Sequence, residues 1–72
     1  MKKVNVVLST LFEEDLTEVE NELEELGVDI EELRYDLLYH RYDLYAKMTL
    51  RQVYKMRKFI KSHAVNIVFV GS

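Results

Sequence analysis

Asp36 and Asp43 come closest, in type and spacing, to a pair of residues that could do acid–base chemistry. They enclose the stretch "LLYHRY", and a hairpin that turns between Leu38 and Arg41 would bring the two carboxylates together across neighbouring strands. Paired carboxylates can share acid and base roles, but catalysis also requires further groups that converge on a pocket. Charges that alternate along an exposed strand produce the same spacing, and we favour that interpretation here.

Histidine, serine, glycine and cysteine offer no better site. The two histidines are far apart, and neither has a second ligand at metal-binding spacing. The serines have no nucleophile motif around them, the glycines form no phosphate-binding loop, and cysteine is absent. We therefore expect no enzyme, no catalytic residue, no cofactor and no metal. The residues considered are His40, His63, Ser9, Ser62, Ser72, Gly27 and Gly71.

The charges are divided along the chain. Residues 13–32 carry eleven aspartates or glutamates and no lysine or arginine, whereas residues 33–63 carry eight lysines or arginines and only two acids. The formal net charge is nevertheless only −3. If two oppositely charged helices lie side by side about 10 Å apart, each supplies counter-charge to the other. We expect the chain to neutralise most of its own charge in this way.

Each charged segment also has a functional interpretation. An acidic surface can imitate the phosphates of nucleic acid and occupy the basic groove of a DNA- or RNA-binding protein, as some phage and mobile-element inhibitors do. A basic helix can contact nucleic-acid phosphates directly, although an acidic neighbour would screen it, so we do not favour that alternative. The commoner explanation of a charge run is a solvated helix face. The residues concerned are Glu14, Glu18, Glu22 and Glu25 on the acidic side and Arg51, Lys55, Lys58 and Lys61 on the basic side.

The elements that would position these residues begin with a strand and a helix. "KKVNVVLS" is rich in valine and predicts a strand with Val4 and Val6 on one face. Thr10 and Glu13 have the spacing of a capping box, so we expect the first helix to begin there. Leucine and valine then recur at helical spacing as far as Gly27, a residue type that commonly ends a helix.

The next segment, residues 28–48, predicts two antiparallel strands. Its leucines and tyrosines alternate on both sides of residues 38–41, at the period of a pleated sheet. The turn itself lacks Gly, Asn and Pro, which disfavours a tight two-residue turn and leaves a longer connection. A helix that begins at Asp29 is the alternative, because Asp29 and Glu32 also have capping-box spacing.

A second helix and a last strand complete the chain. Thr49 and Gln52 repeat the capping-box pattern, and Val53, Met56 and Ile60 form an apolar stripe. "AVNIVFVGS" then predicts a strand with apolar residues on both faces. One face of this strand is predicted to carry Val65, Ile67 and Phe69.

This order of elements predicts a single domain, residues 1–72, with the ferredoxin-like fold. That fold is an α+β arrangement, β-α-β-β-α-β, with a four-stranded antiparallel sheet and two helices on one face. A domain of this size buries only about 60% of its unfolded surface, so an oligomer interface would help to stabilise it.

No apolar run approaches the ~20 residues that span a membrane, and "MKKVNVVLSTLFEED" lacks the cleavage site of a signal peptide. With cysteine absent, we expect a cytoplasmic protein that has no membrane partner.

The open face of that sheet is predicted to be apolar. The outward residues of the first strand include no aromatic side chain, which disfavours stacking of RNA bases. An apolar open face usually lies against another sheet or subunit. We therefore expect a non-catalytic interaction or regulatory module that forms a homo-oligomer or binds another protein. The predicted contact residues are Val7, Leu38, Tyr45, Val68 and Val70.

The chain also resembles the ACT-domain family of small regulatory domains. "LTEVENELEELGVDIEELRYD" is similar to that family's first helix, glycine-containing bend and second strand. "YDLYAKMTLRQVYKMRKFIKSHAVNIVFVG" is similar to its third strand, second helix and last strand. The resemblance implies a non-catalytic domain that assembles through its sheets and senses or regulates. The family's amino-acid site usually includes a glycine in the first loop, where this chain has "STLFEED", so no binding residue is carried over and an amino-acid ligand stays open.

Overall fold

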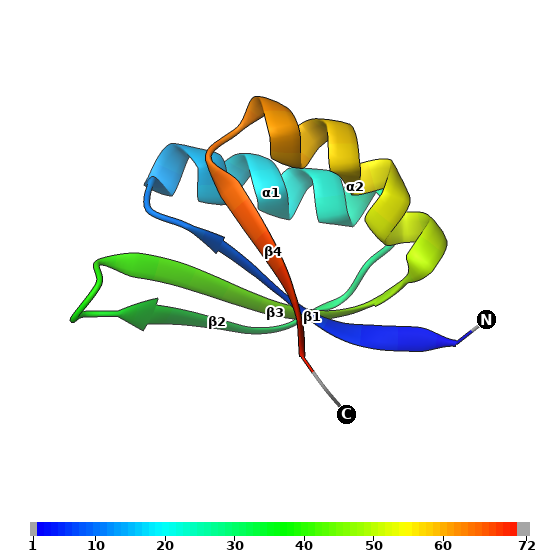
Figure 1. Cartoon of the computed structure of the whole chain (residues 1–72), viewed down its shortest axis with the longest axis horizontal. Coiled ribbons are helices and arrows are strands. Elements are labelled where there is room, and N and C mark those ends of the chain that lie inside the picture. The colour runs from blue at the N-terminus through cyan, green and yellow to red at the C-terminus, as the bar shows by residue number, and fades with distance from the viewer. Residues whose placement is uncertain (1, 71–72) are drawn as a thin grey trace.

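The computed structural model describes residues 2–70, which fold in the order β-α-β-β-α-β (Figure 1). Each helix has 13 residues, and no helix in the described part of the chain is long and apolar enough to cross a membrane. The elements are β1 (Lys3–Thr10), α1 (Glu13–Glu25), β2 (Ile30–Asp36), β3 (Arg41–Thr49), α2 (Leu50–Ser62) and β4 (Val65–Val70).

The four strands form one sheet in the order β2-β3-β1-β4, and every neighbouring pair is antiparallel. Both helices lie over the same face of the sheet (Figure 1). This arrangement confirms the predicted ferredoxin-like fold. It leaves the other face without a helix, and it makes β2 and β4 the two edge strands.

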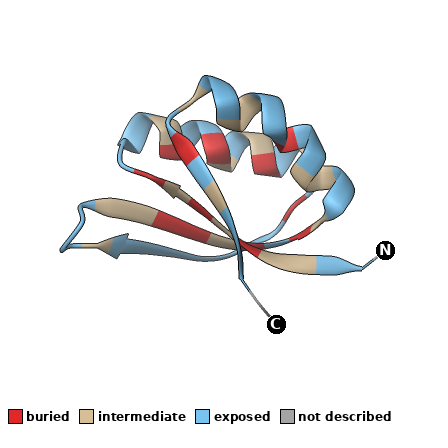
Figure 2. Ribbon diagram, in the orientation of Figure 1, coloured by how far each residue is buried: buried red, intermediate tan, exposed pale blue. Residues whose placement is uncertain are grey.

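The core lies between the helices and the two central strands (Figure 2). Alternate residues of β1 and β3 point toward the helices, as the two-residue period predicts. The predicted stripe of α1 is buried against them, whereas α2 has a single fully covered residue, Met56. Full burial of one such side chain stabilises the fold by about 1.5–3 kcal/mol. The buried set comprises Val6, Leu8, Leu16, Val19, Leu23, Val28, Leu44, Ala46, Met48, Met56 and Val65.

The start of α1 differs from the prediction. The helix begins at Glu13 after Phe12, and no side chain caps it, so the predicted capping box of Thr10 and Glu13 is wrong. Thr10 is instead the last residue of β1, where it pairs with Tyr42 and is only 4% exposed. Its Oγ1 accepts a hydrogen bond from the N–H of Phe12 at 3.2 Å. Pairing within the sheet therefore holds Thr10 away from the helix.

The end of α1 follows the prediction. Gly27 has a φ of 75°, and its N–H donates to the carbonyl of Glu24 at 3.1 Å. The N–H of Val28 donates to the carbonyl of Leu23 at 2.9 Å, which completes a Schellman motif. Both Leu23 and Val28 are buried, so the chain reverses at Gly27 and directs β2 back along the sheet.

Residues 30–49 form the predicted hairpin, and the alternative helix from Asp29 is wrong. A four-residue turn joins β2 to β3, and Asp36 stabilises it. Its Oδ1 accepts hydrogen bonds from the N–H groups of Leu38, at 2.9 Å, and Tyr39, at 3.2 Å. His40 has a φ of 51°, a conformation more usual for Gly or Asn. The carboxylate of Asp36 thus supplies turn chemistry that the sequence otherwise lacks.

Gln52 links the two helices. The predicted capping box is present, because Thr49 Oγ1 accepts from the N–H of Gln52 at 3.2 Å and Gln52 Oε1 accepts from the N–H of Thr49 at 2.9 Å. The amide of the same side chain donates to the carbonyl of Leu26 at 3.2 Å. The first turn of α2 is therefore fixed against the end of α1.

Candidate protein-interaction surface

Three of the predicted contact residues form an apolar row on the open face of the sheet. Val7 pairs with Tyr45 of β3 on one side and with Val68 of β4 on the other. They point away from the helices because Val6, the residue next to Val7 along β1, points into the core. Val7 and Tyr45 are half-buried, but Val68 is 55% exposed. Val70 lies on the same face, two residues beyond Val68, and is 43% exposed.

Leu38 does not belong to this row. It lies in the turn between β2 and β3, where it is 79% exposed, so its predicted place on the open face of the sheet is wrong. The strand ends at Asp36 because the carboxylate of Asp36 binds the N–H of Leu38. The alternating pattern of leucine and tyrosine continues past this point, which made Leu38 look like part of a strand.

Next to the apolar row is a polar network centred on Asp43, which is only 8% exposed. Ser9 donates its hydroxyl to Asp43 Oδ1 at 2.7 Å, and Arg41 Nη2 donates to Oδ2 at 3.2 Å. Arg41 Nε lies 2.9 Å from Oδ1, but its N–H makes no hydrogen bond there, so that contact is electrostatic only. Hydrogen bonding to Asp43, with the negative charges of Asp43 and Asp36, raises the pKa of Arg41 above its ordinary value.

The network explains the spacing of the two aspartates. Arg41 Nη2 also lies 3.8 Å from Asp36 Oδ2, so one guanidinium binds both carboxylates. The hairpin does bring Asp36 and Asp43 together, but as partners of a cation and of backbone groups. This arrangement stabilises the hairpin. Asp43 is more buried than the surface charges that were expected.

Charged side chains also cover the β2 side of the open face. Arg34 Nε lies 3.1 Å from Glu32 Oε2, and a hydrogen bond to Glu32 raises the pKa of Arg34 above its ordinary value. The guanidinium of Arg34 lies 5.4 Å from the centre of the Tyr45 ring, within the range of a cation–π contact. The uncovered apolar part of the open face is therefore the β4 side.

The two edge strands, β2 and β4, differ in charge and in the regularity of their pairing. β2 carries charged residues, which oppose pairing with a like-charged edge, and a bulge interrupts its regular pairing between Ile30 and Glu32. β4 carries no charged residue, and its last three residues are 43% to 55% exposed. Those residues are Val68, Phe69 and Val70.

Phe69 is exposed because α2 does not extend over the end of β4. The sequence places it on the same face as Val65, which is buried, yet Phe69 is 55% exposed. Between α2 and β4 is an apolar groove of about 490 Å³. Its lining includes Leu50 and Tyr54, which are 65% and 72% exposed. The sequence did contain a sign of this groove, because α2 has apolar residues outside its inward stripe.

The charged helix faces do not neutralise each other by direct contact. Four acid–base contacts occur among the described residues, and only one joins the two helical regions. In that contact, His63 Nε2 lies 3.6 Å from Glu18 Oε2, and no lysine or arginine of α2 takes part. The helices lie over one face of the sheet as expected (Figure 1), but no lysine or arginine of α2 forms a direct ion pair with the acids of α1. All the predicted acidic and basic surface residues are exposed except Glu22, which is half-buried.

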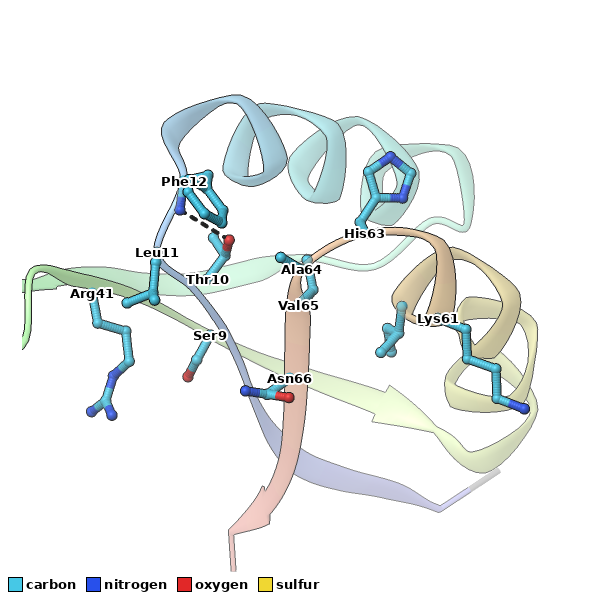
Figure 3. A pocket seen from close by; sticks show the side chains of 11 residues that line it. Ser9, Thr10, Leu11, Phe12, Arg41, Lys61, His63, Ala64, Val65 and Asn66 are labelled. Atoms are coloured by element: carbon cyan, nitrogen blue, oxygen red, sulfur yellow. Dashed lines mark hydrogen bonds between the residues drawn. The ribbon is translucent and has the colours of Figure 1, made fainter.

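A hollow of about 620 Å³ at the end of β1 and the start of β4 brings polar side chains near one another (Figure 3). Ser9, Asn66 and Arg41 extend toward the open face, whereas His63 extends toward α1 (Figure 3). These groups do not converge on one point, so the hollow has no catalytic geometry. Within residues 2–70, no group of three or more Asp, Glu or His side chains is placed to hold a metal ion.

Comparison with known proteins returns no relative. No family model, no curated protein and no solved structure matches the chain. The resemblance to ACT domains thus rests on the sequence segments alone, and the function must be argued from the surface.

Proposed function

We propose that this chain is a small, non-catalytic interaction and regulatory module of the cytoplasm that self-associates through its sheet. One observation carries the proposal: β4 is an edge strand with no charged residue, and its apolar residues are exposed on both faces. In monomeric proteins, an edge strand usually has charged residues or a bulge, or a loop covers it. β2 has two of these features, and β4 has neither charges nor a bulge in its pairing with β1.

Pairing of β4 with a strand of a second molecule would satisfy two needs at once. The outward N–H and C=O groups of β4 would gain partners, as they do when a peptide adds to a sheet edge. Val68, Phe69 and Val70 would lose contact with water, and full burial of one such side chain contributes about 1.5–3 kcal/mol. A domain of 72 residues has a thin stability margin, so this gain is large for it.

The open face supports the same interpretation. Val7 and Tyr45 continue the apolar surface inward from Val68, so a partner strand at β4 would lie beside a continuous apolar row. The polar network around Asp43 limits this row on one side. β4 is therefore the centre of the proposed interface, and the row is its margin.

Light scattering after size-exclusion chromatography tests the proposal with one substitution. We expect Val68→Lys to shift the protein from an oligomer to a monomer, because a charge at an edge strand opposes pairing. Val68 is 55% exposed, so the variant should fold, which circular dichroism would check. Leu38→Lys is the matched control, since Leu38 is exposed in a turn away from β4, and it should remain an oligomer. An unchanged oligomer in Val68→Lys would contradict the proposal.

A second candidate function follows from the acidic face of α1. Because no lysine or arginine of α2 makes a direct ion pair with it, Glu18 and Glu25 present negative charge to solvent. Such a surface suits the basic groove of a DNA- or RNA-binding protein. Immobilised protein should then capture basic proteins from nuclease-treated extract, and added DNA should release them. Reversal of Glu18, Glu22 and Glu25 to lysine should abolish capture, and undiminished capture would rule this function out.

A further inference from the structure

The two sides of the sheet carry exposed apolar residues next to opposite charges. We define the basic edge, where α2 lies beside β4, as Leu50, Tyr54, Arg57, Lys61, Ile67 and Phe69. We define the acidic edge, where α1 lies beside β2, as Glu20, Glu24, Asp29, Ile30, Leu33 and Tyr35. Both helices lie over one face of the sheet (Figure 1), and β4 and β2 are its two edge strands.

The basic edge is a groove with two cations on it. The apolar groove of about 490 Å³ is lined by Arg57 and Lys61, which are exposed and one helical turn apart. Phe69 and Tyr54 supply exposed aromatic rings, and the strand at its base is the uncharged β4. Neither cation makes an ion pair within residues 2–70.

The acidic edge has the matching arrangement. Glu20 and Glu24 are also one helical turn apart, and they line a hollow of about 290 Å³ together with Asp29 and Ile30. Leu33 and Tyr35 of β2 pair with core-facing residues of β3, so their side chains lie on the helix side of the sheet. They are nevertheless 46% and 45% exposed, because α1 does not extend over β2.

Strand directions allow these two edges to join. β4 is antiparallel to β1, whereas β2 runs parallel to β1 because both are antiparallel to β3. A second molecule displaced sideways along the sheet would therefore place its β2 antiparallel to β4 of the first. The helices of both molecules would remain on one face, with α2 of the first beside α1 of the second.

Charge selects this arrangement over symmetric pairing. Two β4 edges related by a two-fold axis would bring Arg57 and Lys61 close to their own copies, and two β2 edges would do the same with Glu20 and Glu24. Like charges across an interface oppose association, and opposite charges favour it. Contact of the basic edge with the acidic edge replaces both repulsions by attractions. A second copy of the chain is thus a complementary occupant of either edge.

We propose, on the basis of the self-association above, that copies of this chain assemble head to tail, with the basic edge of one bound to the acidic edge of the next. Such an interface is heterologous, so each molecule keeps one unfilled edge unless a ring closes. Assembly therefore extends beyond a dimer as concentration rises. Added salt weakens it, because the ion pairs lie at the rim of the interface.

A charge-swap experiment tests the proposal. Arg57→Glu/Lys61→Glu reverses the basic edge, and Glu20→Lys/Glu24→Lys reverses the acidic edge. Each variant alone should self-associate at least about tenfold more weakly than the unmodified protein, because its two edges now have the same sign. An equimolar mixture should recover assembly, since each variant's reversed edge matches the reversed edge of the other.

Matched controls carry the same changes in net charge away from the edges. Lys55→Glu/Lys58→Glu and Glu18→Lys/Glu25→Lys alter exposed residues that line neither edge. Each should self-associate within about twofold of the unmodified protein. The neutral pairs Arg57→Gln/Lys61→Gln and Glu20→Gln/Glu24→Gln should weaken assembly less, and their mixture should recover association in part, because the unchanged acidic edge of the first fits the unchanged basic edge of the second. These milder variants keep the test informative if a reversed variant unfolds.

The outcomes separate this inference from the proposed function. Recovery in the mixture, with both reversed variants weak alone, supports head-to-tail assembly. Loss in only one reversed variant, or no recovery in the mixture, overturns head-to-tail assembly while self-association of the unmodified protein stands. A strictly monomeric unmodified protein overturns both the inference and the proposed function.

Discussion

Val68 lies directly opposite Val7 in the pairing of β4 with β1, on the face of the sheet that has no helix. Val7 is half-buried because strands flank it on both sides, whereas Val68 is 55% exposed because β4 has no neighbour on its outer side. The difference in exposure between these two valines shows that the outer side of β4 lacks a neighbouring strand. A further strand at β4 would give Val68 the surroundings that Val7 already has.

Hydrogen exchange should detect this missing neighbour directly. We expect amide protons of β4 to exchange more slowly as protein concentration rises, because a partner strand would bind the outward N–H groups. The turn at residues 37–40 serves as the internal control, and its exchange should not depend on concentration. Rates in β4 that stay constant over a hundredfold concentration range would count against pairing at this edge.

The hydrogen bond from Ser9 to Asp43 should contribute to the stability of the fold. Ser9→Ala removes the hydroxyl that donates to Asp43 at 2.7 Å and leaves a mostly buried carboxylate with one donor fewer. We expect a loss of about 0.5–1.5 kcal/mol in the free energy of unfolding, measured with urea. Ser62→Ala is the control, because Ser62 is exposed at the end of α2 and its loss should change stability by less than about 0.5 kcal/mol. Equal effects of the two substitutions would show that the network is unimportant.

The contact of Arg41 with Asp43 should be insensitive to alkaline pH. The pKa of Arg41 is raised in the folded protein, so its contribution is fully present below the unfolded-state pKa and is lost only as pH rises through the folded-state pKa. Both values lie in strongly alkaline solution. The difference in unfolding free energy between the unmodified protein and Arg41→Gln should therefore be the same at pH about 7 and about 10. A difference that halves by pH about 10 would refute this assignment.

Gly27 should be required for its backbone conformation alone. A Cβ at this position would have no atom within 4 Å, but the φ of 75° is unfavourable for most side chains. Gly27→Ala should therefore cost about 1–2 kcal/mol of unfolding free energy without any steric clash. Gly27→Asn should cost less, because Asn tolerates this conformation better. Equal stability of all three proteins would mean that the end of α1 is not constrained.

Much of the fold could be predicted because local chemistry and periodicity agree with it. Leu16, Val19 and Leu23 recur at helical spacing and are buried, and Thr49 with Gln52 forms the expected cap. The hairpin was predicted from alternation even without turn residues. It forms because Asp36 binds two backbone N–H groups of the turn, which sequence spacing alone does not reveal.

Features that depend on where one element ends relative to another were harder to predict. Thr10 has the spacing of a cap, but pairing within the sheet removes it from the helix. Leu38 continues the period of a strand that has already ended. Phe69 alternates with core residues, yet α2 stops short of covering it. In each case a local pattern is correct, and the packing of a neighbouring element decides the outcome.

Of the interaction surface, the sequence indicated Val7, Tyr45, Val68 and Val70, and the structure places all four on the open face. It did not indicate that β4 is the unprotected edge, because that depends on how much of the strand the rest of the fold leaves exposed. Nor did it show that the helices leave their charges unpaired by direct contact. That outcome depends on side-chain distances, and within residues 2–70 the one contact that joins the two helical regions is between His63 and Glu18.

Sedimentation velocity of the unmodified protein, from about 10 μM to about 1 mM, tests self-association most directly. The structure predicts a mass that rises with concentration to a multiple of 8.6 kDa and falls again when salt is added. A single species of 8.6 kDa at every concentration would contradict self-association through the sheet.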